Sequence, residues 1–126
     1  MPARIVVVLK ELGFAERVAA QLVDLSYDAI AVGDSMAALE LLEAGRRIEL
    51  LVTCEQFGPH RPTGLSLARM AQYHRPGTKI LFIGAPELAA YAEDVGDFLA
   101  SPVSEPQVVQ KALAMLSSDD RQAGPE

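Results

Sequence analysis

The sequence predicts an α/β domain in which helices cover both faces of a parallel, five-stranded sheet. Five short apolar runs alternate along the chain with segments of helical periodicity, as they do in such sheets. The first run, from Arg4 to Leu9, is rich in β-branched residues and shows no polar alternation, which is typical of a strand buried on both faces. With 126 residues, half of them hydrophobic and 22% charged, the chain is suited to one folded domain.

The first half of the chain is expected to hold three strands, over residues 4–9, 27–32 and 48–53. Between them we predict helices over 13–25 and 36–44. The first helix is amphipathic because apolar residues recur at spacings of three and four. These residues are Phe14, Val18, Leu22 and Leu25. The second helix follows Gly33, and either Asp34 or Ser35 is expected as its N-cap.

In the second half, a loop rich in Gly and Pro over 55–63 precedes a predicted helix over 64–74. Strands are expected over 79–83 and 97–100, with a helix over 86–94 between them because Pro86 suits a first helical turn. The last helix is predicted over 104–116 with Ser104 as its N-cap. We therefore expect a domain over 1–116 and a polar tail or linker over 117–126.

Single helices between consecutive strands favour right-handed crossovers and the flavodoxin-like, doubly wound (βα)5 arrangement, with strand order 2-1-3-4-5. In that arrangement, ligands bind outside the carboxyl ends of the strands. The residues expected at those ends, where we look for function, are Leu9, Lys10, Glu11, Cys54, Glu55, Gly84, Ala85, Ser101 and Pro102.

Five segments of the chain, in order, resemble those of bacterial response-regulator receiver domains. They are the first run from Arg4, the segment from Tyr27 to Leu39, the run over 48–53, the segment Gly64-Leu-Ser-Leu-Ala68, and Phe98-Leu-Ala-Ser-Pro102. The last resembles the closing motif of the family, which has an aromatic residue, two spacers, a lysine and a proline. The resemblance covers residues 4 to about 116.

The resemblance implies where the residues of a phosphorylation switch should lie. The magnesium-binding acidic pair of the family falls on Leu9 and Lys10, and its phosphoacceptor aspartate falls on Cys54. Its hydroxyl residue falls on Gly84 and its lysine on Ser101. The matching residues that remain are the aromatic switch position, Phe98, and Pro102, with Glu11 as an acid just beyond the pair. The chain therefore resembles a degenerate receiver, or pseudo-receiver, without the phosphoacceptor.

Elementary chemistry agrees with that interpretation. Magnesium requires hard oxygen ligands, whereas Leu9 offers none and Lys10 is positively charged. We therefore expect neither metal nor cofactor, and a domain of two-component or phosphorelay signalling that acts by phosphorylation-independent protein–protein contact. The resemblance implies a sensor kinase, an effector domain, a regulator or a second copy of the chain as its partner.

Two alternatives remain open, although Cys54 itself is expected to be a small buried core residue. The vacated pocket and Cys54 could serve a small-molecule or redox sensor. A thiol-dependent enzyme is less favoured, because neither histidine lies at a strand carboxyl end to act as a base. The net charge of −6 argues against direct binding of nucleic acid. The single cysteine and the lack of an apolar stretch near 18 residues favour a cytoplasmic protein that does not enter membranes.

Overall fold

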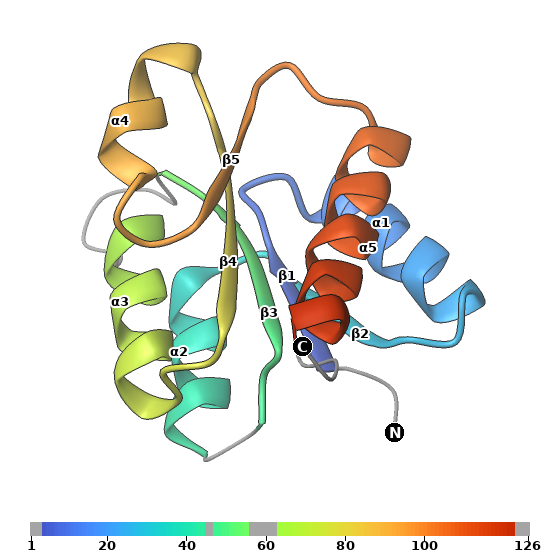
Figure 1. Ribbon diagram of the computed structural model, residues 1–126, viewed down its shortest axis with the longest axis horizontal. Helices are drawn as coiled ribbons and strands as arrows, with labels where there is room; N and C mark the ends of the chain where they lie inside the picture. The colour runs from blue at the N-terminus through green and yellow to red at the C-terminus, as the bar shows by residue number, and fades with distance from the viewer. Residues whose placement is uncertain (1–3, 45–46, 56–62, 123–126) are drawn as a thin grey trace.

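The computed structural model describes residues 4–44, 47–55 and 63–122. Its strands form one parallel sheet in the order β2-β1-β3-β4-β5, which confirms the predicted arrangement (Figure 1). The strands are β1 (Arg4–Val8), β2 (Asp28–Val32), β3 (Leu50–Cys54), β4 (Lys79–Gly84) and β5 (Asp97–Ala100). Most of the predicted Gly- and Pro-rich loop, residues 56–62, and the end of the tail, 123–126, lie outside the described residues.

Helices cover both faces of the sheet (Figure 1). One face carries α1 (Leu12–Asp24) and α5 (Glu105–Gln122), which contact each other. The other carries α2 (Ser35–Glu43), α3 (Gly64–His74), the 3-10 turn η1 (Pro86–Leu88) and the short α4 (Ala89–Ala92).

Each face of the sheet has its own hydrophobic core. Ile5 and Val7 of β1 pack in the core beneath α1 and α5, whereas Val6 and Val8 pack in the core beneath α2 and α3. All four side chains are at most 1% exposed. Side chains alternate across a strand, so a central strand covered by helices on both sides must be apolar at every position. This explains the unbroken β-branched run near the N-terminus.

Polar side chains mark the starts of α2 and α5. Asp34, one of the two predicted candidates, caps α2 because its Oδ1 accepts a hydrogen bond from the Met36 N–H at 3.2 Å. Ser104 caps α5 as predicted: its hydroxyl accepts from the Gln107 N–H at 3.3 Å, and the Gln107 side chain accepts from the Ser104 N–H at 2.7 Å. This reciprocal pair is a capping box.

Two predicted elements differ from the structure beyond small shifts of their ends. The helix expected over 86–94 is divided into η1 and α4, and Ala92 is the only buried residue in those two elements. Because this segment buries so little apolar surface, a longer regular helix would gain little stability from packing. The 3-10 turn of η1 precedes α4, and such turns are common at the starts of helices. The helix expected to end at residue 116 continues through Gln122, so much of the predicted polar tail is helical.

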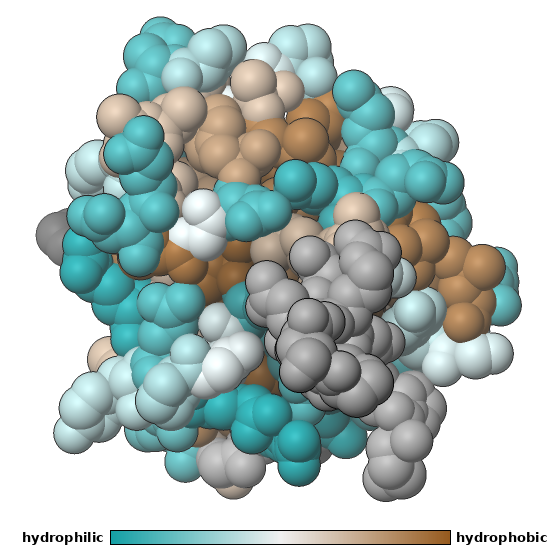
Figure 2. Space-filling view, in the orientation of Figure 1, coloured by the Kyte–Doolittle hydropathy of each residue, from teal (hydrophilic) through white to brown (hydrophobic). Residues whose placement is uncertain are grey.

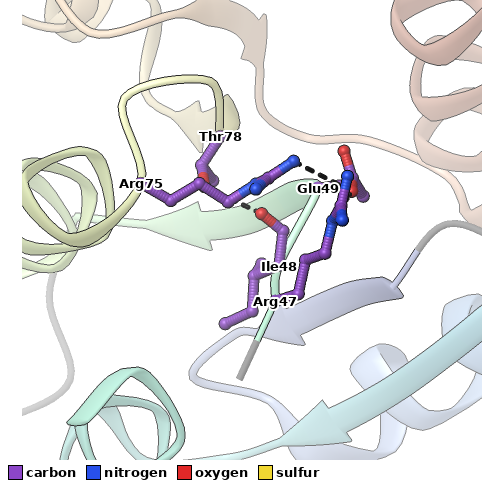
Figure 3. Close-up of polar contacts among 5 residues, drawn as sticks. All are labelled: Arg47, Ile48, Glu49, Arg75 and Thr78. Atoms are coloured by element: carbon purple, nitrogen blue, oxygen red, sulfur yellow. Dashed lines mark hydrogen bonds and ion pairs between the residues drawn. The ribbon is translucent and has the colours of Figure 1, made fainter. Parts of the chain in front are cut away.

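Charged side chains gather at the amino end of β3 (Figure 3). The Glu49 carboxylate lies 2.8 Å from Arg47 Nε and 3.1 Å from Arg75 Nη2. Beside it, the buried Thr78 hydroxyl donates to the Ile48 carbonyl oxygen at 2.8 Å. These contacts join β3 to the segment between α3 and β4, at the edge opposite the predicted site.

Candidate functional site

The carboxyl ends of β1, β3, β4 and β5 lie along one edge of the sheet, where the sequence placed the candidate residues. The parallel register pairs Val8 with Thr53, Cys54 with Ile83, and Gly84 with Ala100. Leu9 and Ser101 directly follow β1 and β5, while Cys54 and Gly84 are the last residues of β3 and β4. The topology therefore brings the predicted positions to neighbouring strand ends.

After β1, the two positions that the resemblance assigned to an acidic pair have opposite environments. Leu9 is 6% exposed and packs in the core beneath α1 and α5. Lys10 is exposed and makes no hydrogen bond or ion pair within the part of the chain that the structure describes. Neither side chain supplies an oxygen ligand for a divalent cation.

Glu11, the acid left beyond that pair, is exposed and precedes α1 without capping it through its side chain. Arg17 of α1 donates a hydrogen bond to Glu105 of α5, which raises the pKa of the Arg17 guanidinium above its ordinary value. The negative charge of Glu11 adds to this effect. Gln21 of α1 also donates to Glu105, at 3.0 Å. These contacts connect α1 to the start of α5, beside the candidate site.

At the end of β3, the start of α3 packs directly against the strand. A Cβ atom added to Gly64 would lie 1.7 Å from the carbonyl oxygen of Cys54. The Gly64 N–H also donates to the Glu55 carbonyl oxygen at 2.9 Å. Cys54, which we expected to be a buried core residue, is half-buried and packs against the core beneath α1 and α5. Its partial exposure follows from its place at the strand end.

Glu55, which the sequence places directly after β3, brings a buried polar atom to the site, and the sequence did not predict that burial. One of its carboxylate oxygens, Oε1, is buried and has no hydrogen-bond partner among the described residues. Burial of such an oxygen without a partner is costly. The only sign of this feature in the sequence is an acidic residue directly after an apolar strand.

At the end of β4, the Leu88 side chain lies in the space that a side chain at Gly84 would occupy. A Cβ on Gly84 would lie 3.1 Å from Leu88 Cδ1 and 3.9 Å from Phe98 Cε1. The Phe98 ring is stacked on the buried Phe82 ring, with centroids 6.4 Å apart and planes inclined by 18°. Phe98 is thus half-buried against the core beneath α2 and α3.

The end of β5 is joined to β4 through the backbone. The Ser101 N–H donates to the Gly84 carbonyl oxygen at 2.8 Å, and the Ser101–Pro102 peptide is cis. The short Ser101 side chain replaces the lysine that the resemblance implies at this position. The two strand ends therefore offer neither a side-chain hydroxyl at Gly84 nor a cation at Ser101.

The described residues hold no group of three or more His, Cys, Asp or Glu side chains placed to share a metal ion. Among the same residues, no helix is long and apolar enough to cross a lipid bilayer.

No protein-family model matches the sequence, and no curated protein matches it. Solved structures do match. By structure, the chain has the fold of response-regulator receiver, or CheY-like, domains. A response regulator receiver protein from Sinorhizobium medicae WSM419 matches at 25% identity and a TM-score of 0.79, over 92% of this chain and 95% of that one.

Two further matches show how the fold is used in chains of different length. A CheY-like receiver domain protein from Methanospirillum hungatei JF-1 matches at 16% identity and a TM-score of 0.82, over 98% of this chain and 100% of that one. NtrX from Brucella abortus matches at 24% identity and a TM-score of 0.81. This chain is covered over 97% of its length in that match but spans 28% of NtrX.

Proposed function

We propose that this chain is an atypical receiver domain of two-component or phosphorelay signalling that acts by protein–protein contact, without phosphoryl transfer. The structural matches support the receiver fold. One observation carries the rest: five positions at neighbouring strand ends hold residues unsuited to the phosphorylation chemistry of the family. They are Leu9, Lys10, Cys54, Gly84 and Ser101.

The charges at the strand ends disfavour phosphoryl transfer. That reaction depends on metal ions and positively charged groups that stabilise the transferring group. An apolar Leu9 and a cationic Lys10 do not attract magnesium to the end of β1. Without the metal, and without a carboxylate at Cys54, the site has neither the acceptor nor its electrostatic support.

The packing of Phe98 disfavours a moving switch. In the switch that the resemblance implies, a hydroxyl after β4 and an aromatic residue on β5 respond together to phosphorylation. Here Leu88 lies where a side chain of Gly84 would extend, and Phe98 is held by its stacking on Phe82. We infer that Phe98 is a fixed packing residue, so that the domain presents one conformation to its partner.

The proposed partner is a protein: a sensor kinase, an effector domain, another regulator or a second copy of the chain. Figure 2 shows apolar surface between hydrophilic side chains on the face that carries α4, β5 and α5. Tyr91 of α4 is 50% exposed, and Leu88, Leu99 and Val103 are half-buried nearby in sequence. Because α4 is a single turn, we infer that this face recognises a partner specific to this chain.

A second candidate, redox or small-molecule sensing, is favoured by one observation. Cys54 is partly exposed and is followed by Glu55, whose buried Oε1 has no hydrogen-bond partner among the described residues. Reaction of the Cys54 thiol with a peroxide or an electrophile could change the contact between β3 and α3. This candidate predicts rapid modification of Cys54 in the folded protein, which the first proposal does not require.

Restoration of the switch tests the proposed function. In a variant that combines Leu9→Asp, Lys10→Asp, Cys54→Asp, Gly84→Thr and Ser101→Lys, three carboxylates should gather at the strand ends. Their repulsion should lower stability without metal, and magnesium should restore it, raising the melting temperature. The Gly84→Thr change requires a slight shift of Leu88, which the flexible end of that side chain allows.

The unmodified protein is the matched control, and its melting temperature should not respond to magnesium. A variant that folds but shows no magnesium-dependent rise would contradict the assignment of these five positions to a vacated receiver pocket. A clear rise in the unmodified protein would contradict the proposal that the pocket has lost its metal.

A further inference from the structure

We propose that the outer surfaces of α2 and α3 together bind a second copy of this chain, forming a symmetric dimer. We call the exposed residues Met36, Glu40 and Glu43 the α2 stripe, and Arg69, Met70 and Tyr73 the α3 stripe. The proposal rests on the fold and on these side chains. It adds a contact between two copies of the chain to the α4, β5 and α5 face considered for a partner above, and it does not depend on the loss of phosphorylation.

The two stripes face away from the sheet. The inner sides of the helices are buried, through Ala38 and Leu42 on α2 and through Leu67, Ala68 and Ala71 on α3. Large apolar groups nevertheless remain on the outside: Met36 is 37% exposed, Met70 is 38% exposed and Tyr73 is 81% exposed. Tyrosine, methionine and arginine are enriched at protein interfaces, and tyrosine and arginine supply many of their strongest contacts.

The charges of the two stripes are opposite in sign. Glu40, Glu43 and Arg69 form no ion pair with any described residue, although α2 and α3 contact each other. Charged side chains on other helices do pair, as Arg17 does with Glu105 and Lys111 with Asp97. The outer surface therefore carries two acidic residues on α2 and one basic residue, Arg69, on α3, with apolar groups on both.

Twofold symmetry makes such a surface complementary to itself. The two helices lie side by side and both follow strands of a parallel sheet, so they run in the same direction (Figure 1). A twofold axis parallel to them, within the interface, would place α2 of one copy against α3 of the other. Ser35 begins α2 and Gly64 begins α3, so Glu40 and Arg69 are each the sixth residue of their helix.

In this arrangement, Arg69 of each copy lies opposite the acidic residues of the other copy's α2 stripe, so the contact forms twice. Met70 and Tyr73 of each copy lie toward the partner's α2. A different protein would have to present an acidic and a basic helix in the same parallel order, whereas a second copy does so by symmetry. Two helices of 9 and 11 residues offer a small interface, so we expect a dissociation constant on the order of micromolar.

Sedimentation velocity over a series of concentrations tests the dimer in the full chain. We expect reversible dimerisation that weakens at high salt, because exposed ion pairs are screened. Arg69→Glu should raise the dissociation constant at least about tenfold, since it turns two attractions into repulsions. Tyr73→Ala should also weaken the dimer. Circular dichroism should show that both variants remain folded.

Charge exchange distinguishes this interface from any other. Adding Glu40→Arg and Glu43→Arg to Arg69→Glu should recover much of the lost affinity, because the two stripes are then complementary with their signs exchanged. Glu87→Arg, the same kind of change at an exposed residue of η1, should have no effect. A chain that stays monomeric at all concentrations, a dimer insensitive to Arg69→Glu, or one disrupted by Tyr91→Ala instead would overturn the proposal. None of these results bears on the magnesium response of the five-position variant, so the two proposals fail separately.

Discussion

Gly64 packs against the carbonyl group of Cys54 with no room for a side chain. An added Cβ would lie 1.7 Å from the Cys54 oxygen and 2.7 Å from its carbonyl carbon. Both atoms belong to the backbone of a paired strand and cannot turn aside. The close approach places the first turn of α3 directly beside the end of β3, and so helps to shape the candidate site.

Gly64→Ala should therefore destabilise the protein by about 2–4 kcal/mol, because α3 must move away from β3 to admit the methyl group. Urea denaturation measures this change. Gly77→Ala is the matched control, since a Cβ there meets nothing within 4 Å, and its effect should stay within about 0.5 kcal/mol. Equal effects at the two glycines would show that the contact between α3 and β3 is looser than described.

The stacking of Phe98 on Phe82 should contribute to stability. Phe98→Leu removes the ring contact and part of the buried area, and should cost about 1–2 kcal/mol. Tyr91→Leu makes a similar change at a ring that is 50% exposed, and should cost less than about 0.5 kcal/mol. If Phe98→Leu proved as mild as its control, Phe98 would not be fixed by packing, and a moving aromatic switch would be the better interpretation.

The hydrogen bond of Thr78 offers a test of the edge shown in Figure 3. Thr78 is 3% exposed, and its hydroxyl donates to the Ile48 carbonyl oxygen at 2.8 Å. Thr78→Val keeps the shape but removes the donor, so it should lower the free energy of unfolding by about 1–2 kcal/mol. Thermal and urea unfolding should agree on the loss, and unchanged stability would show that this bond contributes nothing.

The reactivity of Cys54 separates the two candidate functions. Because Cys54 is half-buried and packs against the core, its thiol should react with a thiol reagent more slowly in the native protein than in urea. Rates are measured by absorbance under both conditions, with a Cys54→Ser variant as the blank. A native rate equal to or above the unfolded rate would favour redox or electrophile sensing.

The sheet could be predicted from the sequence because its signals are local and repeated. The apolar run in β1 and the alternation of strands with helices identify a parallel sheet, and the bounds of α3 and β5 agree with the predicted ones. The strand order followed from the general behaviour of such folds. These features depend on which residues are buried, which the pattern of apolar residues reveals.

Other features could not be predicted from the sequence, because they depend on contacts between residues that lie far apart along the chain. The extension of α5 could not be predicted because no apolar stripe marks it. The place of Leu88 beside Gly84, and the approach of Gly64 to Cys54, are visible only when the elements are assembled. The extension of α5 to Gln122 escaped detection because the apolar stripe ends near Leu116. Once a helix is formed, each further turn costs little, so it can continue without burying apolar side chains.

Above all, we propose that this receiver fold does not bind a phosphoryl group. The most direct test is a titration of the isotopically labelled protein with beryllofluoride and magnesium, followed by amide resonances. We predict no shifts at Leu9, Cys54, Gly84 or Ser101, and no incorporation of label from acetyl phosphate. Saturable shifts centred on Cys54 and the neighbouring strand ends would contradict the account, because they would show that the site still binds the metal and the phosphoryl mimic.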